Sequence, residues 1–104
     1  MSQRIKDNIP FINLLLNTNK KQSIALIKTI DRSQTDALTE IIYNIFNLSL
    51  SHKVLQKLNK RKAMFKKVTN KKSYSRRKQI IYKHRYQIID TLNLVKDKLI
   101  KILQ

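Results

Sequence analysis

The 104-residue sequence predicts an all-α fold, a compact bundle of about five helices whose last helix is long and amphipathic. Three observations predict it. The chain has no glycine and one proline, so the tight hairpins of β-rich folds and glycine-rich phosphate loops are not expected. Its apolar residues recur at helical spacing. The segments between these apolar clusters contain Ser, Thr and Asn, which are favoured N-cap residues.

The first half of the chain predicts three short amphipathic helices. Pro10 suits a first helical position. Asn19, with Gln22 three residues later, has capping-box spacing and starts a helix to about residue 30. Ser33 is expected to start the third. The three apolar stripes are Ile12, Leu15 and Leu16; Ile24, Leu26 and Ile27; and Leu38, Ile41, Ile42, Ile45 and Leu48.

Two longer helices are expected in the second half. Ser51 caps a helix over about 52–69, in which Arg61 or Lys62 stands where the pattern asks for an apolar residue. Ser73 or Ser75 caps the last helix, which runs to about residue 103. Its apolar stripe predicts packing against a helix of this chain or of a second copy. The candidate self-association residues are Ile88, Leu92, Val95, Leu99 and Ile102.

Positive charge is concentrated in one third of the sequence. Residues 53–85 contain ten lysines, four arginines and no acid, so +14 of the formal net charge of +17 lies there. Residues 1–52 have a net charge of +2, and residues 86–104 have +1. Charge of one sign at this density repels itself and destabilises a compact state unless a polyanion neutralises it. The sequence therefore predicts a polyanion partner, and nucleic acid is the expected one.

Lysine outnumbers arginine in this block, which favours contacts to phosphates with little reading of base sequence. Three tyrosines interleave the arginines: Tyr74, Tyr82 and Tyr86 are candidates for stacking on bases or, equally, for packing within the protein. The candidate nucleic-acid contacts are Lys53, Lys57, Lys60, Arg61, Lys62, Lys66, Lys67, Lys71, Lys72, Arg76, Arg77, Lys78, Lys83 and Arg85.

Catalytic chemistry is not expected. Acid–base and metal chemistry need clustered His, Cys, Asp or Glu, and the chain has no cysteine. Asp36 and Glu40 form its one ligand-like pair, expected to be solvated acids near a helix start. His52 and His84 are expected on the surface. We therefore predict no catalytic residue, no metal and no cofactor.

Location follows from the same features. The longest uncharged runs have about 12 residues, fewer than the roughly 20 that span a bilayer, and the N-terminus lacks a signal peptide's apolar stretch. We expect a protein that is not secreted, with no transmembrane segment, in the nucleus of a host cell or inside a virion.

Two alternatives stay open. A sequence-specific DNA-binding regulator would need a recognition helix, yet the third predicted helix has almost no cations. A membrane-active basic amphipathic virion protein would segregate charge around a helix, whereas the last helix segregates it along its length.

The order of segments resembles that of small basic proteins of Polinton/Maverick elements and adintovirus-like DNA viruses. The matching stretches are LLLNTNKKQSIALIKTI, DALTEIIYNIFNLSLS and the basic run through KKSYSRRKQII, within about residues 12–81. Such proteins typically continue into a glycine-containing apolar tail, where this chain has the amphipathic segment 80–103. The resemblance implies a genome-associated or virion core protein. As the nucleic-acid partner, we expect DNA in preference to RNA.

We therefore expect a single domain, 1–104. Residues 1–50 would supply an apolar helical core, 51–86 the basic nucleic-acid-binding helices, and 87–104 an amphipathic packing or self-association segment. The partners expected are nucleic acid and, through that last segment, a second copy of the chain, but not a membrane.

Overall fold

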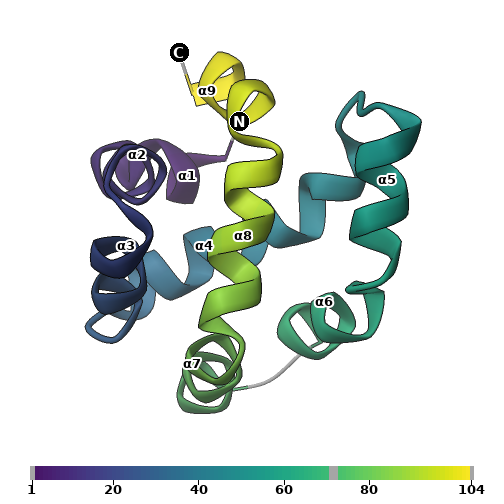
Figure 1. The fold of residues 1–104 in the computed structure, drawn as a ribbon. Helices are drawn as coiled ribbons and strands as arrows, with labels where there is room; N and C mark the ends of the chain where they lie inside the picture. The colour runs from purple at the N-terminus through teal and green to yellow at the C-terminus, as the bar shows by residue number, and fades with distance from the viewer. Residues whose placement is uncertain (1, 71–72, 104) are drawn as a thin grey trace.

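A computed structural model of the chain describes residues 2–70 and 73–103, apart from the side chain of Phe46. These residues form α-helices and one 3-10 turn, with no strand among them, and fold into a globule with a radius of gyration of 12.6 Å (Figure 1). The all-α prediction is confirmed. The elements are α1 (Gln3–Asp7), α2 (Ile9–Asn17), α3 (Lys20–Ile27), α4 (Arg32–Asn44), η1 (Ile45–Asn47), α5 (His52–Asn59), α6 (Lys62–Thr69), α7 (Tyr74–Lys83), α8 (Arg85–Leu94) and α9 (Lys96–Leu103).

The predicted count of about five helices is wrong, because the described residues form nine. Single residues bend the chain where continuous helix was expected: His84 (φ −104°, ψ 21°) separates α7 from α8, and Val95 (φ −109°, ψ 14°) separates α8 from α9. Both lie in the bridge region, which needs no glycine. The carbonyl of each bend residue accepts a hydrogen bond from the following helix, His84 O from Ile88 N and Val95 O from Leu99 N. The single long last helix is therefore three helices.

A similar break divides the predicted helix 52–69. Lys60 and Arg61 connect α5 to α6, and Arg61 has φ −106° and ψ 10°. Asn8 (φ −115°, ψ 14°) likewise joins α2 to α1, a helix that the sequence did not predict. These bends turn each short helix so that its own apolar stripe points to one shared core.

That core draws on every part of the chain. Ile12, Ile27 and Ile42 come from the predicted apolar half, and they meet Leu58 of α5 and Ile81 of α7, all almost completely buried. The basic helices therefore bury their apolar faces in the same cluster as the first 50 residues. Their lysines are left on the outside.

The C-terminal stripe packs within its own chain. Ile88, Leu92, Val95 and Leu99 are buried in the core, whereas Ile102 is 46% exposed. The first four were candidates for self-association, and that assignment is corrected, because the chain's own helices already cover them.

Several helix starts follow the predicted capping chemistry. The side chains of Asn19, Ser51 and Ser73 accept hydrogen bonds from backbone N–H groups in the first turns of α3, α5 and α7. Ser33 was expected to start the third helix, but α4 begins at Arg32, because Asp31 and Gln34 form a reciprocal capping box. Ser33 Oγ instead accepts a hydrogen bond of 2.9 Å from Asn8 Nδ2.

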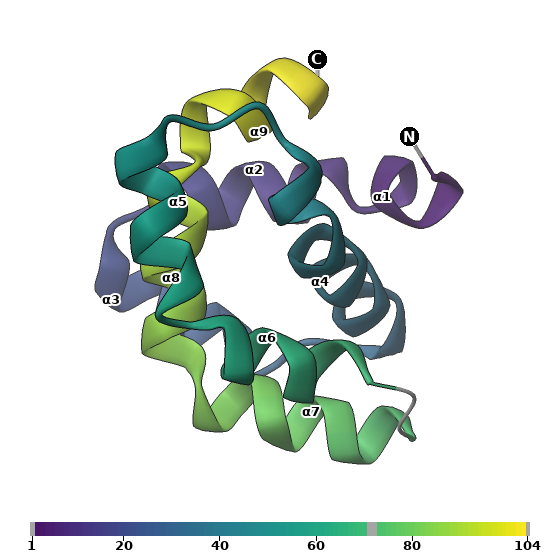
Figure 2. The ribbon, with the colours of Figure 1, turned by 90° about the vertical axis from the view of Figure 1, so that its right-hand side faces the viewer.

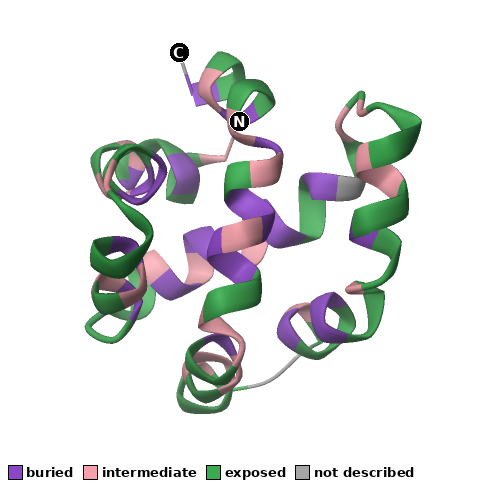
Figure 3. Ribbon diagram, viewed as in Figure 1, coloured by how far each residue is buried: buried purple, intermediate pink, exposed green. Residues whose placement is uncertain are grey.

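Helices α5, α6 and α7 occupy one side of the molecule. Figure 2 shows α5 and α6 facing the viewer with α7 along the lower edge, and α6 and α7 run antiparallel as a helical hairpin. Helix α4 packs against both α6 and α7. In Figure 3, α5 is mostly exposed, whereas the middle of α8 is buried. Most of the predicted basic block thus belongs to α5, α6 and α7, which follow one another in the chain.

Candidate nucleic-acid interface

A cationic cleft lies between α6 and α7. It has a volume of about 330 Å³, and most of its described lining comes from α7, with Lys67 contributed by α6. Among the residues described, none that line it carries a carboxylate. A cleft lined by one sign of charge focuses the field and raises the local concentration of counter-ions. The lining residues are Lys67, Arg76, Gln79, Ile80, Lys83 and His84.

The apolar faces of the two helices position these cations. Phe65 and Val68 are buried on the inner side of α6, so the neighbouring Lys67 is exposed. Ile81 is completely buried on α7, and Arg76 and Lys83 lie on the exposed side of the same helix. Burial of the apolar stripes thus leaves the cleft lysines and arginine available to a ligand.

Two further surface hollows are also cationic. One lies along α5, lined by Lys53, Gln56, Lys57, Asn59 and Lys60. The other, the α3–α7 hollow, has a volume of about 450 Å³ and is lined by Ile27, Lys28, Tyr74, Ser75, Lys78, Gln79 and Tyr82. No described lining residue of either is acidic.

Eight of the predicted contact residues have exposed side chains with no ion-pair partner among the residues that the structure describes. They are Lys53, Lys57, Lys60, Lys62, Lys66, Lys67, Arg76 and Lys83. Lys71 and Lys72 were also predicted as contacts and lie outside the described residues.

Two of the predicted arginines have structural partners instead. Arg77 Nη2 lies 3.0 Å from Asp36 Oδ1 on α4, and both side chains are largely buried. Arg61 Nη1 donates to Thr91 Oγ1 over 2.8 Å, which ties the α5–α6 connection to α8. The apolar pattern called for an apolar residue at position 61 or 62. Arg61 can stand there because its guanidinium reaches a buried polar partner, Thr91. Both guanidinium groups thus have partners within the fold, and their roles as nucleic-acid contacts stay predictions.

Arg85 and two tyrosines form an exposed cluster. Nη1 of Arg85 donates to the Tyr82 carbonyl over 2.9 Å. Its Cζ lies 4.2 Å from the Tyr82 ring centroid and 4.8 Å from that of Tyr86. Tyr82 is 38% exposed and Tyr86 52% exposed. Both rings are thus held in place and accessible.

Tyr74 is more enclosed. Its hydroxyl donates to the Ile30 carbonyl over 3.4 Å, and Arg32 and Lys78 lie 5.4 and 5.8 Å from its ring centroid. Its ring therefore helps to pack the start of α7 against the α3–α4 connection. Of the three tyrosines predicted as stacking candidates, Tyr82 and Tyr86 are exposed and Tyr74 is not.

Several acids have partners within the fold. Asp36 and Glu40 were expected to be solvated, but Asp36 is largely buried and pairs with Arg77, and Glu40 is half-buried and accepts a 2.8 Å hydrogen bond from Ser2 Oγ. Lys20 pairs with Asp90 at 2.8 Å. Over residues 2–70 and 73–103, no group of three His, Cys, Asp or Glu residues is placed to hold a metal ion.

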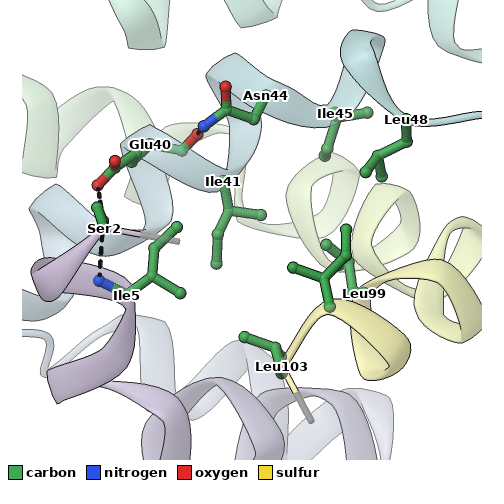
Figure 4. Close-up of a pocket in the computed structure, with 10 residues that line it drawn as sticks. Ser2, Ile5, Glu40, Ile41, Asn44, Ile45, Leu48, Leu99 and Leu103 are labelled. Atoms are coloured by element: carbon green, nitrogen blue, oxygen red, sulfur yellow. Dashed lines mark hydrogen bonds between the residues drawn. The ribbon is translucent and has the colours of Figure 1, made fainter.

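An apolar pocket of about 190 Å³ lies at another part of the surface (Figure 4). Ile5 of α1, Ile41 of α4 and Leu99 of α9 point into it, and Ser2 and Glu40 bond at its edge. It contains no lysine or arginine among its described lining residues, so its chemistry differs from that of the cationic hollows. None of the helices in the described part of the chain is long and apolar enough to cross a membrane.

Several lining residues of these hollows were not predicted from the sequence, among them Gln79, Lys28 and His84. Gln79 carries no charge and so was not part of the charge count. Lys28 lies 25 residues before the basic block, and only the packing of α3 beside α7 brings it to the hollow. His84 was expected on the surface but without a site.

Comparison with protein-family models, with curated proteins and with solved structures finds no match for this chain. The resemblance to small basic proteins of Polinton/Maverick elements therefore stays a prediction, and the function is argued from the geometry of the described residues.

Proposed function

We propose that this chain is a non-enzymatic nucleic-acid-binding protein that contacts phosphates with little sequence preference. The observation that carries the proposal is the α6–α7 cleft, in which Lys67, Arg76 and Lys83 converge without a carboxylate among the described lining residues. Like charges gathered in this way are unfavourable in the free protein and are neutralised by a phosphate backbone, which releases its condensed counter-ions in exchange.

The cations lie on more than one surface, which favours compaction of a nucleic acid over recognition of one base sequence. The α5 hollow supplies three lysines, separate from those of the cleft. A protein with two cationic surfaces engages two stretches of one polymer, and the second contact gains from the raised effective concentration. We propose that the protein compacts or packages DNA as a viral or virus-derived core protein, in the nucleus of a host cell or inside a virion.

The test is a salt titration with matched variants. Lys67→Ala/Arg76→Ala/Lys83→Ala removes the cleft cations, whereas Lys6→Ala/Lys21→Ala/Lys101→Ala removes three exposed lysines from α1, α3 and α9 and lowers the net charge equally. Binding to two unrelated 30-base-pair duplexes is followed by fluorescence anisotropy at several salt concentrations.

The wild type is expected to bind both duplexes similarly. Its plot of log K against log salt should be steep. The magnitude of that slope should fall by about 2 to 3 in the cleft variant, since each neutralised phosphate contributes about 0.9 to it. The control variant should lose less than about 1. Equal losses in the two variants, or wild-type binding that does not respond to salt, would overturn the proposal.

A further inference from the structure

The α3–α7 hollow combines aromatic and cationic side chains. Tyr74 and Tyr82 contribute rings, and Lys28 and Lys78 contribute ammonium groups. None of its described lining residues is acidic. A ring beside cations is the combination that binds a base by stacking while its phosphate is neutralised.

Tyr82 is held from outside this hollow. Arg85 lies over its ring and bonds to its carbonyl, yet Arg85 is not among the residues that line the hollow. The guanidinium therefore fixes the ring without occupying the space beside it. A ring already fixed loses little conformational freedom when a ligand stacks on it.

The hollow and the cationic cleft share one lining residue. Gln79 of α7 lines both of them. Lys83 of the cleft and Tyr82 of the hollow are neighbours in the chain. A strand whose phosphates lie against Lys83 and Arg76 thus has a base within reach of Tyr82.

We propose that the α3–α7 hollow receives an unpaired base, stacked on Tyr82, from a single strand whose phosphates lie in the α6–α7 cleft. The inference rests on the proposed function and names its substrate class, nucleic acid with unpaired bases. A base in an intact duplex reaches the hollow only after leaving its stack, which costs unpairing and unstacking energy. Single strands should therefore gain from Tyr82, and duplexes should not.

The experiment compares three variants on two ligands. Tyr82→Ala removes the ring, Tyr82→Phe keeps it, and Tyr43→Ala removes a 67% exposed tyrosine from α4 as a matched control. The ligands are a 12-nucleotide oligothymidine and a 12-base-pair duplex, each measured by anisotropy at fixed salt. Circular dichroism checks that each variant keeps its helical content.

Tyr82→Ala should weaken oligothymidine binding by about tenfold, in the range of one lost base–aromatic stack, and duplex binding by less than about twofold. Tyr82→Phe and Tyr43→Ala should bind both ligands as the wild type does. Equal effects of Tyr82→Ala on the two ligands, or no effect on either, would overturn the stacking inference. Neither result would alter the salt-slope difference that tests phosphate binding, so the two proposals fail separately.

Discussion

Arg77 Nη2 lies 3.0 Å from Asp36 Oδ1, and this ion pair joins the basic helix α7 to the apolar helix α4. The Asp36 side chain is 15% exposed and the Arg77 side chain 22% exposed. The contact is a close ion pair without hydrogen-bond geometry, because in the described part of the chain neither Oδ1 of Asp36 nor Nε of Arg77 has a hydrogen-bond partner. Each charge is therefore stabilised mainly by the other. Removing one of them leaves the other largely buried and without a counter-charge.

Asp36→Asn should lower the free energy of unfolding by about 2 kcal/mol, because breaking a largely buried pair strands a charge, while partial exposure keeps the loss below that of a fully buried one. Urea denaturation measures it. Asp97→Asn, at the exposed first turn of α9, is the control and should cost about 0.5 kcal/mol. Similar losses in the two variants would show that the pair adds little stability.

Arg76 and Arg77 are neighbours with different roles. Arg76→Ala should weaken duplex binding by several-fold with little change in the urea midpoint, since its exposed side chain lines the cleft. Arg77→Ala should lower the urea midpoint with little change in duplex affinity, because the Arg77 guanidinium pairs with Asp36. Anisotropy and urea titrations on both variants decide between them. If Arg77→Ala instead lost affinity and kept its stability, Arg77 would be a ligand contact.

The helix starts and most apolar stripes were predictable because their signals are local. Caps at Asn19, Ser51 and Ser73 depend on side chains within three residues of the bonded N–H. The bends at His84 and Val95 were not predictable, because any residue can adopt their bridge-region angles and the apolar stripe runs on unchanged through both.

The site was predictable in part for the same reason. A charge count identifies the block that contains Lys67, Arg76 and Lys83. It does not separate Arg76 from Arg77, since their difference depends on Asp36, 41 residues away along the chain. Lys28 joins the α3–α7 hollow only through tertiary packing.

Thr91 is the buried partner that Arg61 reaches from the α5–α6 connection. Its Oγ1 accepts from Arg61 over 2.8 Å and donates to the Gln87 carbonyl over 2.7 Å. Thr91→Val should lower the free energy of unfolding by about 1 to 3 kcal/mol, since Arg61 loses its acceptor. Thr29→Val, at an exposed threonine, is the control and should change stability by less than about 0.5 kcal/mol. Urea denaturation compares the two, and equal effects would contradict the assigned role of Thr91.

Leu92 and Ile102 belong to the same predicted stripe, but Leu92 is buried in the chain's own core and Ile102 is 46% exposed. Leu92→Ala should lower the free energy of unfolding by about 2 to 5 kcal/mol, the cost of a cavity in a packed core. Ile102→Ala should cost less than about 1 kcal/mol.

Because the buried residues of the stripe are covered within one chain, the wild-type urea midpoint should not change when protein concentration rises tenfold. A midpoint that rises with concentration and loses this dependence in Ile102→Ala would instead indicate that a second copy stabilises the fold through the C-terminal helix, since association makes apparent stability depend on protomer concentration.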